Sequence, residues 1–292
     1  MLPLPIQFFG LARQGKTTYL AALAMALQRV NAVWNGFTAM AATEPSQRLL
    51  REVNTYFETG RLPPASVPGV RDCYLILMNR VPKWVKVALM VRDCPGKAFQ
   101  GIDVDVKEAS FLLKAPLTFM FISLADLKEL GRGDTLDTLM NGYINTLVAH
   151  GARLEVENRK VVVVLTKADL LGATLPIDLL SYIEEDPIWK ISRLGDLTRW
   201  YSLAEMDSYL QELARISRVI EEWICRQAAG RMLVTLARDR NIELQFSLVS
   251  STGAAPRAQD NVLSTRWEPS RVLDPFLWAL ELDSRRRIEM DR

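Results

Sequence analysis

Short apolar runs alternate along this chain of 292 residues with longer segments whose apolar positions repeat every three to four residues. Short, largely apolar segments indicate strands at about residues 4–9, 117–123, 161–166 and 242–249, and the aliphatic run at 161–166 indicates a strand buried on both faces. Ala/Leu-rich or amphipathic segments indicate helices, at about 17–30, 45–59, 134–150 and 203–229. Because strands alternate with helices, the pattern predicts an α/β fold: a doubly wound, mostly parallel sheet with helices on both faces.

Two segments lengthen this alternation. We expect one domain over residues 1–292 with insertions at about 31–71 and about 171–241, the second of them helical. Between the insertions, strands at about 72–79 and 84–92 predict a hairpin.

The first candidate site is the segment 10–17, which reads G-x-x-x-x-G-K-T, the pattern of a phosphate-binding loop. Glycines let backbone N–H groups turn toward phosphates. The lysine ammonium reaches the β- and γ-phosphate oxygens, and the threonine hydroxyl suits Mg²⁺. A preceding strand and a following helix are the context that the motif requires. The expected phosphate-binding residues here are Gly10, Gln14, Gly15, Lys16, Thr17 and Thr18.

A second motif, D-x-P-G, follows the strand at 84–92 and contains Asp93 and Gly96. An aspartate at the end of a strand can hold Mg²⁺ through a water molecule, and a glycine N–H can approach the γ-phosphate closely. A strand that ends in a Pro-Gly turn is common by itself. Its place after a phosphate-binding loop favours Asp93 as a metal ligand beside Thr17, and Gly96 as a phosphate contact.

Two later strands end in motifs that resemble the base-reading segments of GTPases. Thr166, Lys167 and Asp169 form T-K-x-D, which resembles N/T-K-x-D. In those proteins the Asp carboxylate accepts from guanine N1–H and the exocyclic amine, a donor pair that adenine lacks. Ser250 and Ser251 resemble the S-A-x loop, whose backbone N–H contacts guanine O6. Ser-rich turns are common after strands, so the order of the motifs supports this second resemblance.

Four motifs in this order, each after a predicted strand, resemble the TRAFAC class of P-loop GTPases, which includes Ras-like and Era-like G domains. The resemblance covers about residues 4–280. Segments 15–23 and 274–280 are similar to bacterial double-GTPase domains, a family thought to act in conflict or signalling systems, often with a second GTPase.

This resemblance implies a cytoplasmic protein that binds GTP, hydrolyses it to GDP with Mg²⁺ as cofactor, and acts as a nucleotide-controlled switch. The implied partners are GTP or GDP and a protein effector or activator, for example a second GTPase. Two alternatives stay open. One is a GTP-binding scaffold with little or no hydrolysis; the other is a P-loop ATPase or kinase, which T-K-x-D disfavours.

The chain departs from the family pattern at two places, and one family residue cannot be located in it. Lys97 stands where Ras-like domains carry the glutamine that orients water, which favours slow hydrolysis without a partner. Arg13 occupies a loop position where cation-dependent Era-like enzymes often carry Asn. Its charge makes it, with Lys16, a candidate catalytic residue, the alternative being an exposed arginine. The first-switch threonine is not identifiable; the candidates are Thr38, Thr43, Thr59 and Ser66.

Bulk properties exclude other classes. A net charge of +2 gives no general field for nucleic acid. No run of apolar residues is long enough for a transmembrane helix, so we expect none. The three cysteines, Cys73, Cys94 and Cys225, are widely spaced, which favours a reducing compartment such as the cytoplasm and no metal cage.

Overall fold

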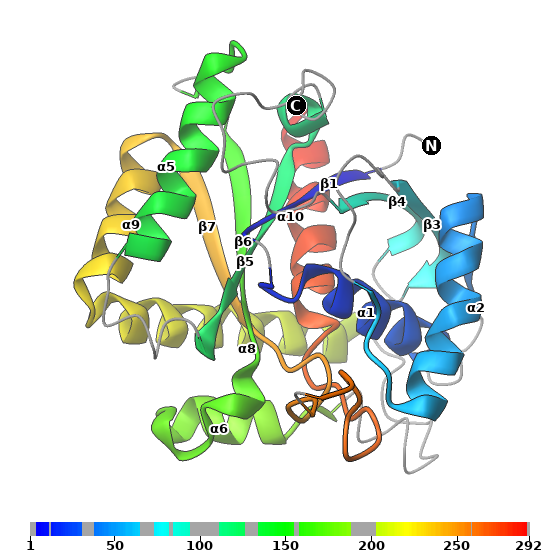
Figure 1. The fold of residues 1–292 in the computed structure, drawn as a ribbon. Helices are drawn as coiled ribbons and strands as arrows, with labels where there is room; N and C mark the ends of the chain where they lie inside the picture. The colour runs from blue at the N-terminus through cyan, green and yellow to red at the C-terminus, as the bar shows by residue number, and fades with distance from the viewer. Residues whose placement is uncertain are drawn as a thin grey trace.

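The computed structural model describes residues 4–11, 13–30, 38–64, 73–81, 84–93, 111–125, 134–154, 158–187, 203–257 and 259–290. Its centre is a seven-stranded sheet in the order β2-β3-β4-β1-β5-β6-β7 (Figure 1). The strands are β1 Leu4–Phe9, β2 Thr38–Ala41, β3 Cys73–Val81, β4 Trp84–Asp93, β5 Leu117–Ser123, β6 Arg159–Thr166 and β7 Ile242–Leu248. The longer helices are α1 Lys16–Val30, α2 Glu44–Thr59, α5 Asp134–Ala149, α6 Ile177–Glu184, α8 Leu203–Cys225, α9 Ala228–Asp239 and α10 Asp274–Met290.

Five neighbouring strands, from β4 through β1, β5 and β6 to β7, run parallel, and β3 pairs antiparallel with β4. The predicted mostly parallel α/β sheet is therefore confirmed, and so is the hairpin of β3 and β4. In β5 and β6 every residue is buried, as expected for central strands covered on both sides.

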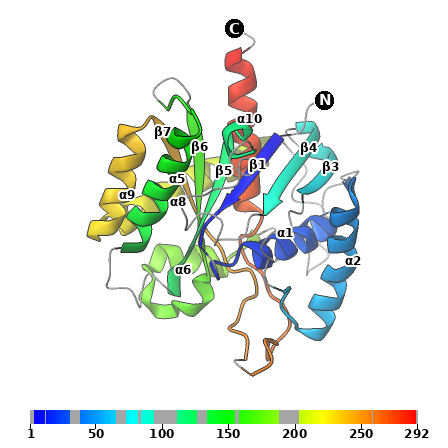
Figure 2. The ribbon, with the colours of Figure 1, turned by 45° about the horizontal axis from the view of Figure 1, so that its top comes forward.

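Aromatic contacts show that helices cover both faces of the sheet. The ring of Phe8 lies 5.8 Å from that of Tyr19 in α1, whereas the ring of its neighbour Phe9 lies 5.3 Å from that of Tyr143 in α5. Because successive strand residues point to opposite faces, α1 and α5 pack on opposite sides. Figure 2 shows α9 beside α5 and places α10 behind the sheet in that view.

Helix α8 lies along the outer strand β7. The Phe246 N–H donates to the Ser217 hydroxyl at 2.9 Å, and that hydroxyl donates to the Gln245 side chain at 3.1 Å. A backbone group on the outward side of the last strand therefore has its partner in α8.

The structure departs from the predicted elements in two places. The single helix expected at 203–229 is two helices, since α8 ends at Cys225 and α9 begins at Ala228. Arg231 donates to the carbonyl of Cys225, the last residue of α8, and to that of Arg226, and a Cβ at Gly230 would lie 2.2 Å from the carbonyl oxygen of Ile224. Tertiary packing thus separates α8 from α9 at a point where helix propensity alone predicts a continuous helix. The second departure is β2, which pairs with β3 and was not predicted.

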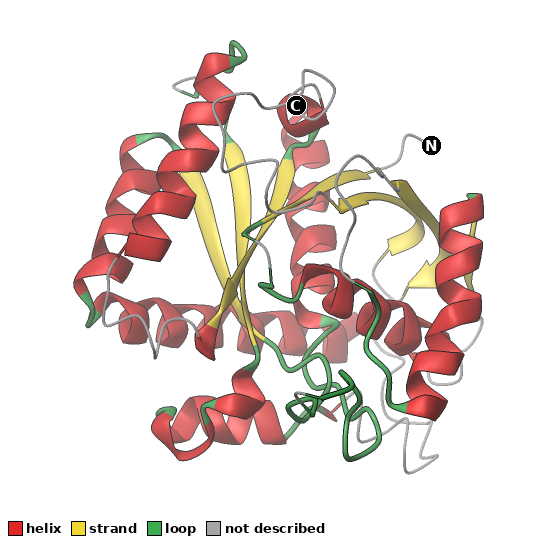
Figure 3. Ribbon diagram, in the orientation of Figure 1, coloured by secondary structure: helices red, strands yellow, loops and turns green. Residues whose placement is uncertain are grey.

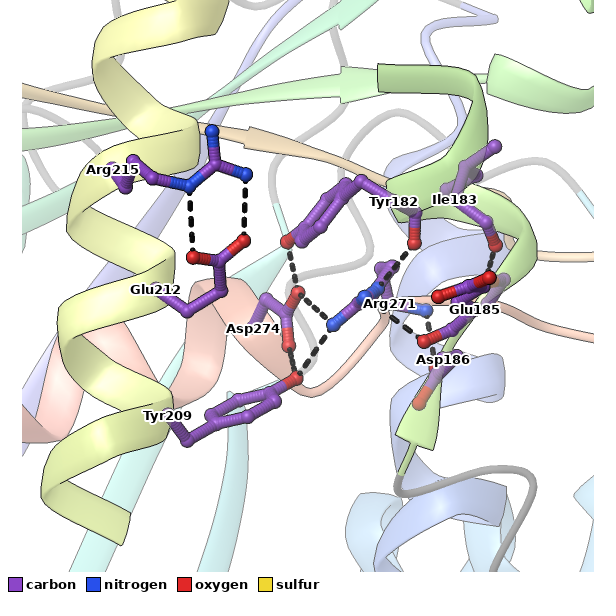
Figure 4. A network of polar contacts seen from close by, with 10 residues as sticks. Tyr182, Ile183, Glu185, Asp186, Tyr209, Glu212, Arg215, Arg271 and Asp274 are labelled. Carbon is purple, nitrogen blue, oxygen red and sulfur yellow. Dashed lines mark hydrogen bonds and ion pairs between the residues drawn. The ribbon is translucent and has the colours of Figure 1, made fainter. Parts of the chain in front are cut away.

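A buried polar cluster joins the end of α6, α8 and the start of α10; we call it the Arg271 cluster. Its members are Tyr182, Asp186, Tyr209, Arg271 and Asp274, all buried (Figure 4). Both tyrosine hydroxyls donate to the Asp274 carboxylate. Burial raises the pKa of each tyrosine well above its usual value, so both hydroxyls stay protonated as donors.

Arg271 is the centre of this cluster. Its Nε donates to Tyr182 O at 2.7 Å, and its guanidinium lies 3.8 Å from the centre of the Tyr182 ring. It also donates to the Tyr209 hydroxyl at 3.2 Å and to Glu185 O at 3.0 Å, and it lies 3.7 Å from the Asp274 carboxylate. A cation on the last carbonyls of α6 satisfies groups that a helix end leaves unpaired.

The Arg271 cluster predicts an unusual pH dependence of stability. Burial raises the pKa of Asp274 from 3.8 to about 6; Asp186 adds to the rise, while Arg271, Tyr182 and Tyr209 oppose it. Within that window the folded protein retains a proton that the unfolded chain releases. The free energy of unfolding should therefore fall as the pH rises through the window, by up to about 1.4 kcal/mol per pH unit from this group.

Urea unfolding of the wild type and of Asp274→Asn, at pH values of about 4.5, 5.5 and 6.5, isolates this contribution. The variant lacks the ionisable group, so the stability difference between the two proteins should change with pH. A difference that is constant with pH would contradict the expectation.

Candidate functional site

The phosphate-binding motif forms the turn between β1 and α1. Gly10, with φ of 150°, passes so close to β5 that a Cβ would lie 2.8 Å from Phe121 O. Gly15 has φ of 85°, and its carbonyl accepts from Tyr19 N at 2.8 Å as α1 begins. A side chain would clash at the first position and strain the backbone at the second, which explains both glycines.

Lys16 folds back over this loop. Its Nζ donates to Gly10 O and to Leu11 O, both at 2.9 Å, and the side chain is buried. Thr17 and Thr18 stand in the first turn of α1. An ammonium beside a helix N-terminus is an arrangement that attracts phosphate oxygens.

Gln14 ties the loop to two neighbouring strands. Its side-chain oxygen accepts from Ser123 N at the end of β5, and its carbonyl accepts from the Thr166 hydroxyl at 2.9 Å at the end of β6. Thr166 was expected at the base, but its buried hydroxyl contacts the phosphate-binding loop. Its contact with a base stays a prediction.

The two candidate base-reading segments, T-K-x-D and the turn that contains Ser250 and Ser251, lie together at the ends of β6 and β7. Lys167 has a left-handed backbone, φ of 62°, and begins the 3₁₀ helix η2, Ala168–Leu170. The Ser250 hydroxyl donates to Asp169 Oδ1 at 2.5 Å and accepts from Gly253 N at 3.0 Å. One oxygen of the carboxylate is therefore held by the serine, which fixes the direction of the other.

The hydroxyls of the two serines differ in their hydrogen bonds. The Ser251 hydroxyl is buried and has no hydrogen-bond partner within the part of the chain that the structure describes. A buried hydroxyl without a partner is uncommon and suits a site completed by a ligand.

Ser270 is a contributor that sequence reasoning missed. Its N–H donates to Ser250 O at 2.8 Å, and its carbonyl accepts from Ser250 N at 3.1 Å. Glu268 N donates to Thr252 O at 3.0 Å, so the segments 250–252 and 268–270 run side by side. This pairing lies within the long loop that follows β7 (Figure 3). No motif marks Ser270, since only the folded loop brings it to Ser250.

The remaining candidates are spread more widely. Arg13 is exposed on the loop with φ of 65°, a left-handed conformation that few residues other than glycine adopt. Asp93 ends β4, the strand beside β1, in register with Phe8. Gly96 and Lys97 lie outside the described residues.

Two of the four candidates for a first-switch residue have structural partners in or beside α2. Thr43 caps α2 by accepting from Ser46 N, and the Thr59 hydroxyl donates to Thr55 O in the last turn of that helix. Thr38 lies in β2, and Ser66 is outside the described residues.

The expected Mg²⁺ ligands suit that ion by their chemistry. Thr17 and Asp93 offer oxygen donors, at the start of α1 and at the end of β4, the strand that pairs with β1. Among the residues that the structure describes there is no cluster of three His, Cys, Asp or Glu that suits a metal. Two protein oxygens, completed by phosphate and water, are the usual surroundings of Mg²⁺ beside a nucleotide.

The described helices include none with the length and apolar character needed to cross a membrane.

Comparison with solved structures finds weak likeness to GTP-binding proteins. The signal recognition particle receptor SRβ–GTP/SRX complex from Chaetomium thermophilum matches with a TM-score of 0.39 and 14% identity, over 89% of this chain and 95% of that one. Nucleolar GTP-binding protein 1 from Plasmodium falciparum matches with a TM-score of 0.40 and 12% identity, over 100% and 94%. A bacterial selenocysteine-specific elongation factor matches with a TM-score of 0.35 and 12% identity over 86% of this chain, which spans only 26% of that factor.

No curated protein matches significantly. The family comparison is decisive: the model described as Double-GTPase 2 matches residues 4–224, which include the phosphate-binding loop and T-K-x-D. The described elements and the order of the motifs agree with the resemblance to P-loop GTPases, and the chain belongs to the Double-GTPase 2 family.

Proposed function

We propose that this protein binds GTP, hydrolyses it to GDP with Mg²⁺ as cofactor, and acts as a nucleotide-controlled switch for a protein partner. One observation carries the proposal: the Thr166 hydroxyl donates to Gln14 O at 2.9 Å, so the loop at 10–17 and the T-K-x-D segment are in direct contact, as a single nucleotide site requires. Membership of a GTPase family supports the choice of nucleotide.

In this proposal the chain itself supplies most of the groups that bind the phosphates and neutralise their charge. Backbone N–H groups at the start of α1 and the Lys16 ammonium hold the β- and γ-phosphates and take up negative charge as water attacks in line. Thr17 and Asp93 are the residues that would hold Mg²⁺, and the ion would add positive charge beside the phosphate oxygens. Arg13 reaches the phosphates from the solvent side of the loop in this scheme and adds transition-state charge.

The base is read by Asp169. Ser250 holds one carboxylate oxygen, and the other accepts from the N1–H and amine of guanine. A base without that donor pair leaves a charged oxygen unpaired, which is a costly mismatch. The protein acts in the cytoplasm, where GTP is available, with a partner for which a second GTPase is the first candidate, given the family's description.

Asp169→Asn should shift the preference from GTP toward XTP. The amide oxygen can still accept from Ser250, while its NH₂ faces the base and suits the oxygen that xanthine carries in place of the guanine amine. Competition of labelled GTP by XTP measures the shift. Asp178→Asn, an exposed aspartate in α6, is the matched control and should leave the preference unchanged. Full guanine selectivity in Asp169→Asn would remove Asp169 from the base site.

Lys16→Ala should lower GTP affinity by at least about tenfold, because a charged hydrogen bond to phosphate is lost. Lys160→Ala is the control. Lys160 is also buried and donates to a carbonyl, that of Leu282, but it lies at the opposite end of β6. Equilibrium binding and thermal unfolding should show a loss of affinity in the first variant and at most a loss of stability in the second. Equal GTP affinity in both would refute the phosphate-loop assignment.

Hydrolysis by the protein alone should be slow, about 10⁻⁴ to 10⁻² per second, because Lys97 replaces the water-orienting glutamine. If the Arg13 guanidinium takes the place of a monovalent cation, the rate should be the same in K⁺ and in Na⁺. Arg13→Asn and Arg13→Gly both tolerate the left-handed backbone at this position, so they test the side chain alone.

Single-turnover GTP hydrolysis in matched K⁺ and Na⁺ buffers separates the outcomes. Arg13→Asn should become K⁺-dependent and lose rate in Na⁺, and Arg13→Gly should lose rate in both. Strong K⁺ stimulation of the wild type argues against the role of Arg13. The absence of any turnover favours the GTP-binding scaffold.

A further inference from the structure

We propose that the Arg271 cluster is a positioning element of the base site, and that Tyr209 and Tyr182 set the discrimination between guanine and closely related bases. This inference rests on the proposed function, because it concerns the base that Asp169 reads. It assigns a role to buried residues that lie outside every nucleotide-binding motif of the chain.

The first step is the dependence of Asp169 on Ser250. The serine hydroxyl donates to Asp169 Oδ1 at 2.5 Å, so a displacement of Ser250 turns the carboxylate. A carboxylate that must accept two hydrogen bonds from one base edge has little tolerance for such a turn.

The second step is the dependence of Ser250 on Ser270. Both backbone groups of Ser250 bond to Ser270, at 3.1 and 2.8 Å. Gly253 is enclosed by the same pairing, since a Cβ there would lie 2.7 Å from Glu268 O. The segment 268–270 therefore holds the turn at 250–253 in place.

The third step concerns Arg271, the residue after Ser270, which fixes the segment 268–270 to the end of α6. Its backbone N–H donates to Asp186 at 2.6 Å, and its side chain holds the end of α6 through the carbonyls of Tyr182 and Glu185. The backbone of Arg271 is left-handed, with φ of 60°, a conformation that a non-glycine residue keeps only where its surroundings enforce it. Figure 4 shows the guanidinium enclosed between the two tyrosines and Asp274.

The fourth step extends the anchor to the phosphate side. The Tyr19 hydroxyl in α1 donates to Val272 O at 3.0 Å, one residue after Arg271. The cluster thus holds the loop between β7 and α10. Ser250 lies near the start of this loop, and Val272, near its end, contacts α1. A change in the cluster should act on the base through this loop while the phosphate contacts of Lys16 stay in place.

The test uses the ratio of the dissociation constants of ITP and GTP. The two nucleotides share the triphosphate and ribose, and hypoxanthine keeps N1–H but lacks the exocyclic amine. The ratio therefore reports the hydrogen bond between that amine and the Asp169 carboxylate. Tyr209→Phe removes one hydroxyl from Asp274 and Arg271 and keeps the ring. We expect the ratio to fall by about three- to tenfold, chiefly through weaker GTP binding. Tyr182→Phe, which keeps the ring under the guanidinium, should act in the same direction and serves if Tyr209→Phe does not fold.

Tyr143→Phe is the matched control. Tyr143 is equally buried, its hydroxyl bonds to Thr118 at 3.1 Å, and it lies on the α5 side of the sheet. It should lower the melting temperature of the nucleotide-free protein without changing the ratio. In an Asp169→Ala background, Tyr209→Phe should have no further effect on the ratio, because the two changes act through the same contact.

The outcomes distinguish the two proposals. If the wild type prefers GTP to ITP and Tyr209→Phe and Tyr182→Phe keep that preference, the cluster only stabilises the fold and the inference is wrong. If the wild type itself does not bind GTP, the proposed function fails and this inference fails with it. If the wild type binds GTP and ITP equally, Asp169 makes no contact with the guanine amine, and this inference is wrong while the proposed GTP hydrolysis still stands.

Discussion

Gln14 is the residue through which the parts of the candidate site meet. The loop that contains it leaves β1, and its side chain and carbonyl bond to the ends of β5 and β6. Since β5 lies between β1 and β6, the loop must cross β5, and the missing side chain of Gly10 allows this approach. The candidate phosphate-binding and base-reading segments, about 150 residues apart in the sequence, are therefore held beside each other.

Much of this arrangement can be predicted from short stretches of the sequence. The runs 117–123 and 161–166 are almost entirely apolar, and central parallel strands are the structures that bury such runs on both faces. The loop after β1 and T-K-x-D carry chemistry in their residue types and their spacing. The sequence identified these elements because each depends on neighbours within a few residues.

Other features depend on partners far along the chain. The four residues of β2 have no strand signal of their own and owe their conformation to pairing with β3. The break between α8 and α9 lies at Arg226 and Gln227, which are good helix formers, and the contact of Gly230 with Ile224 decides it. Likewise, Thr166 resembles a base contact in sequence, and only the fold shows its hydroxyl on the phosphate-binding loop.

The coverage of β7 by α8 has a consequence for how this protein can meet other chains. An outer strand is a template for pairing, and here the outward N–H of Phe246 already has its acceptor in Ser217. A strand from another molecule would have to displace a helix of 23 residues to extend the sheet on this side. The opposite border is formed by β2, a strand of four residues in which Met40 is 52% exposed. At the β7 border, a helix thus protects the sheet against strand-mediated aggregation. At the β2 border, this protection relies on the shortness of the strand.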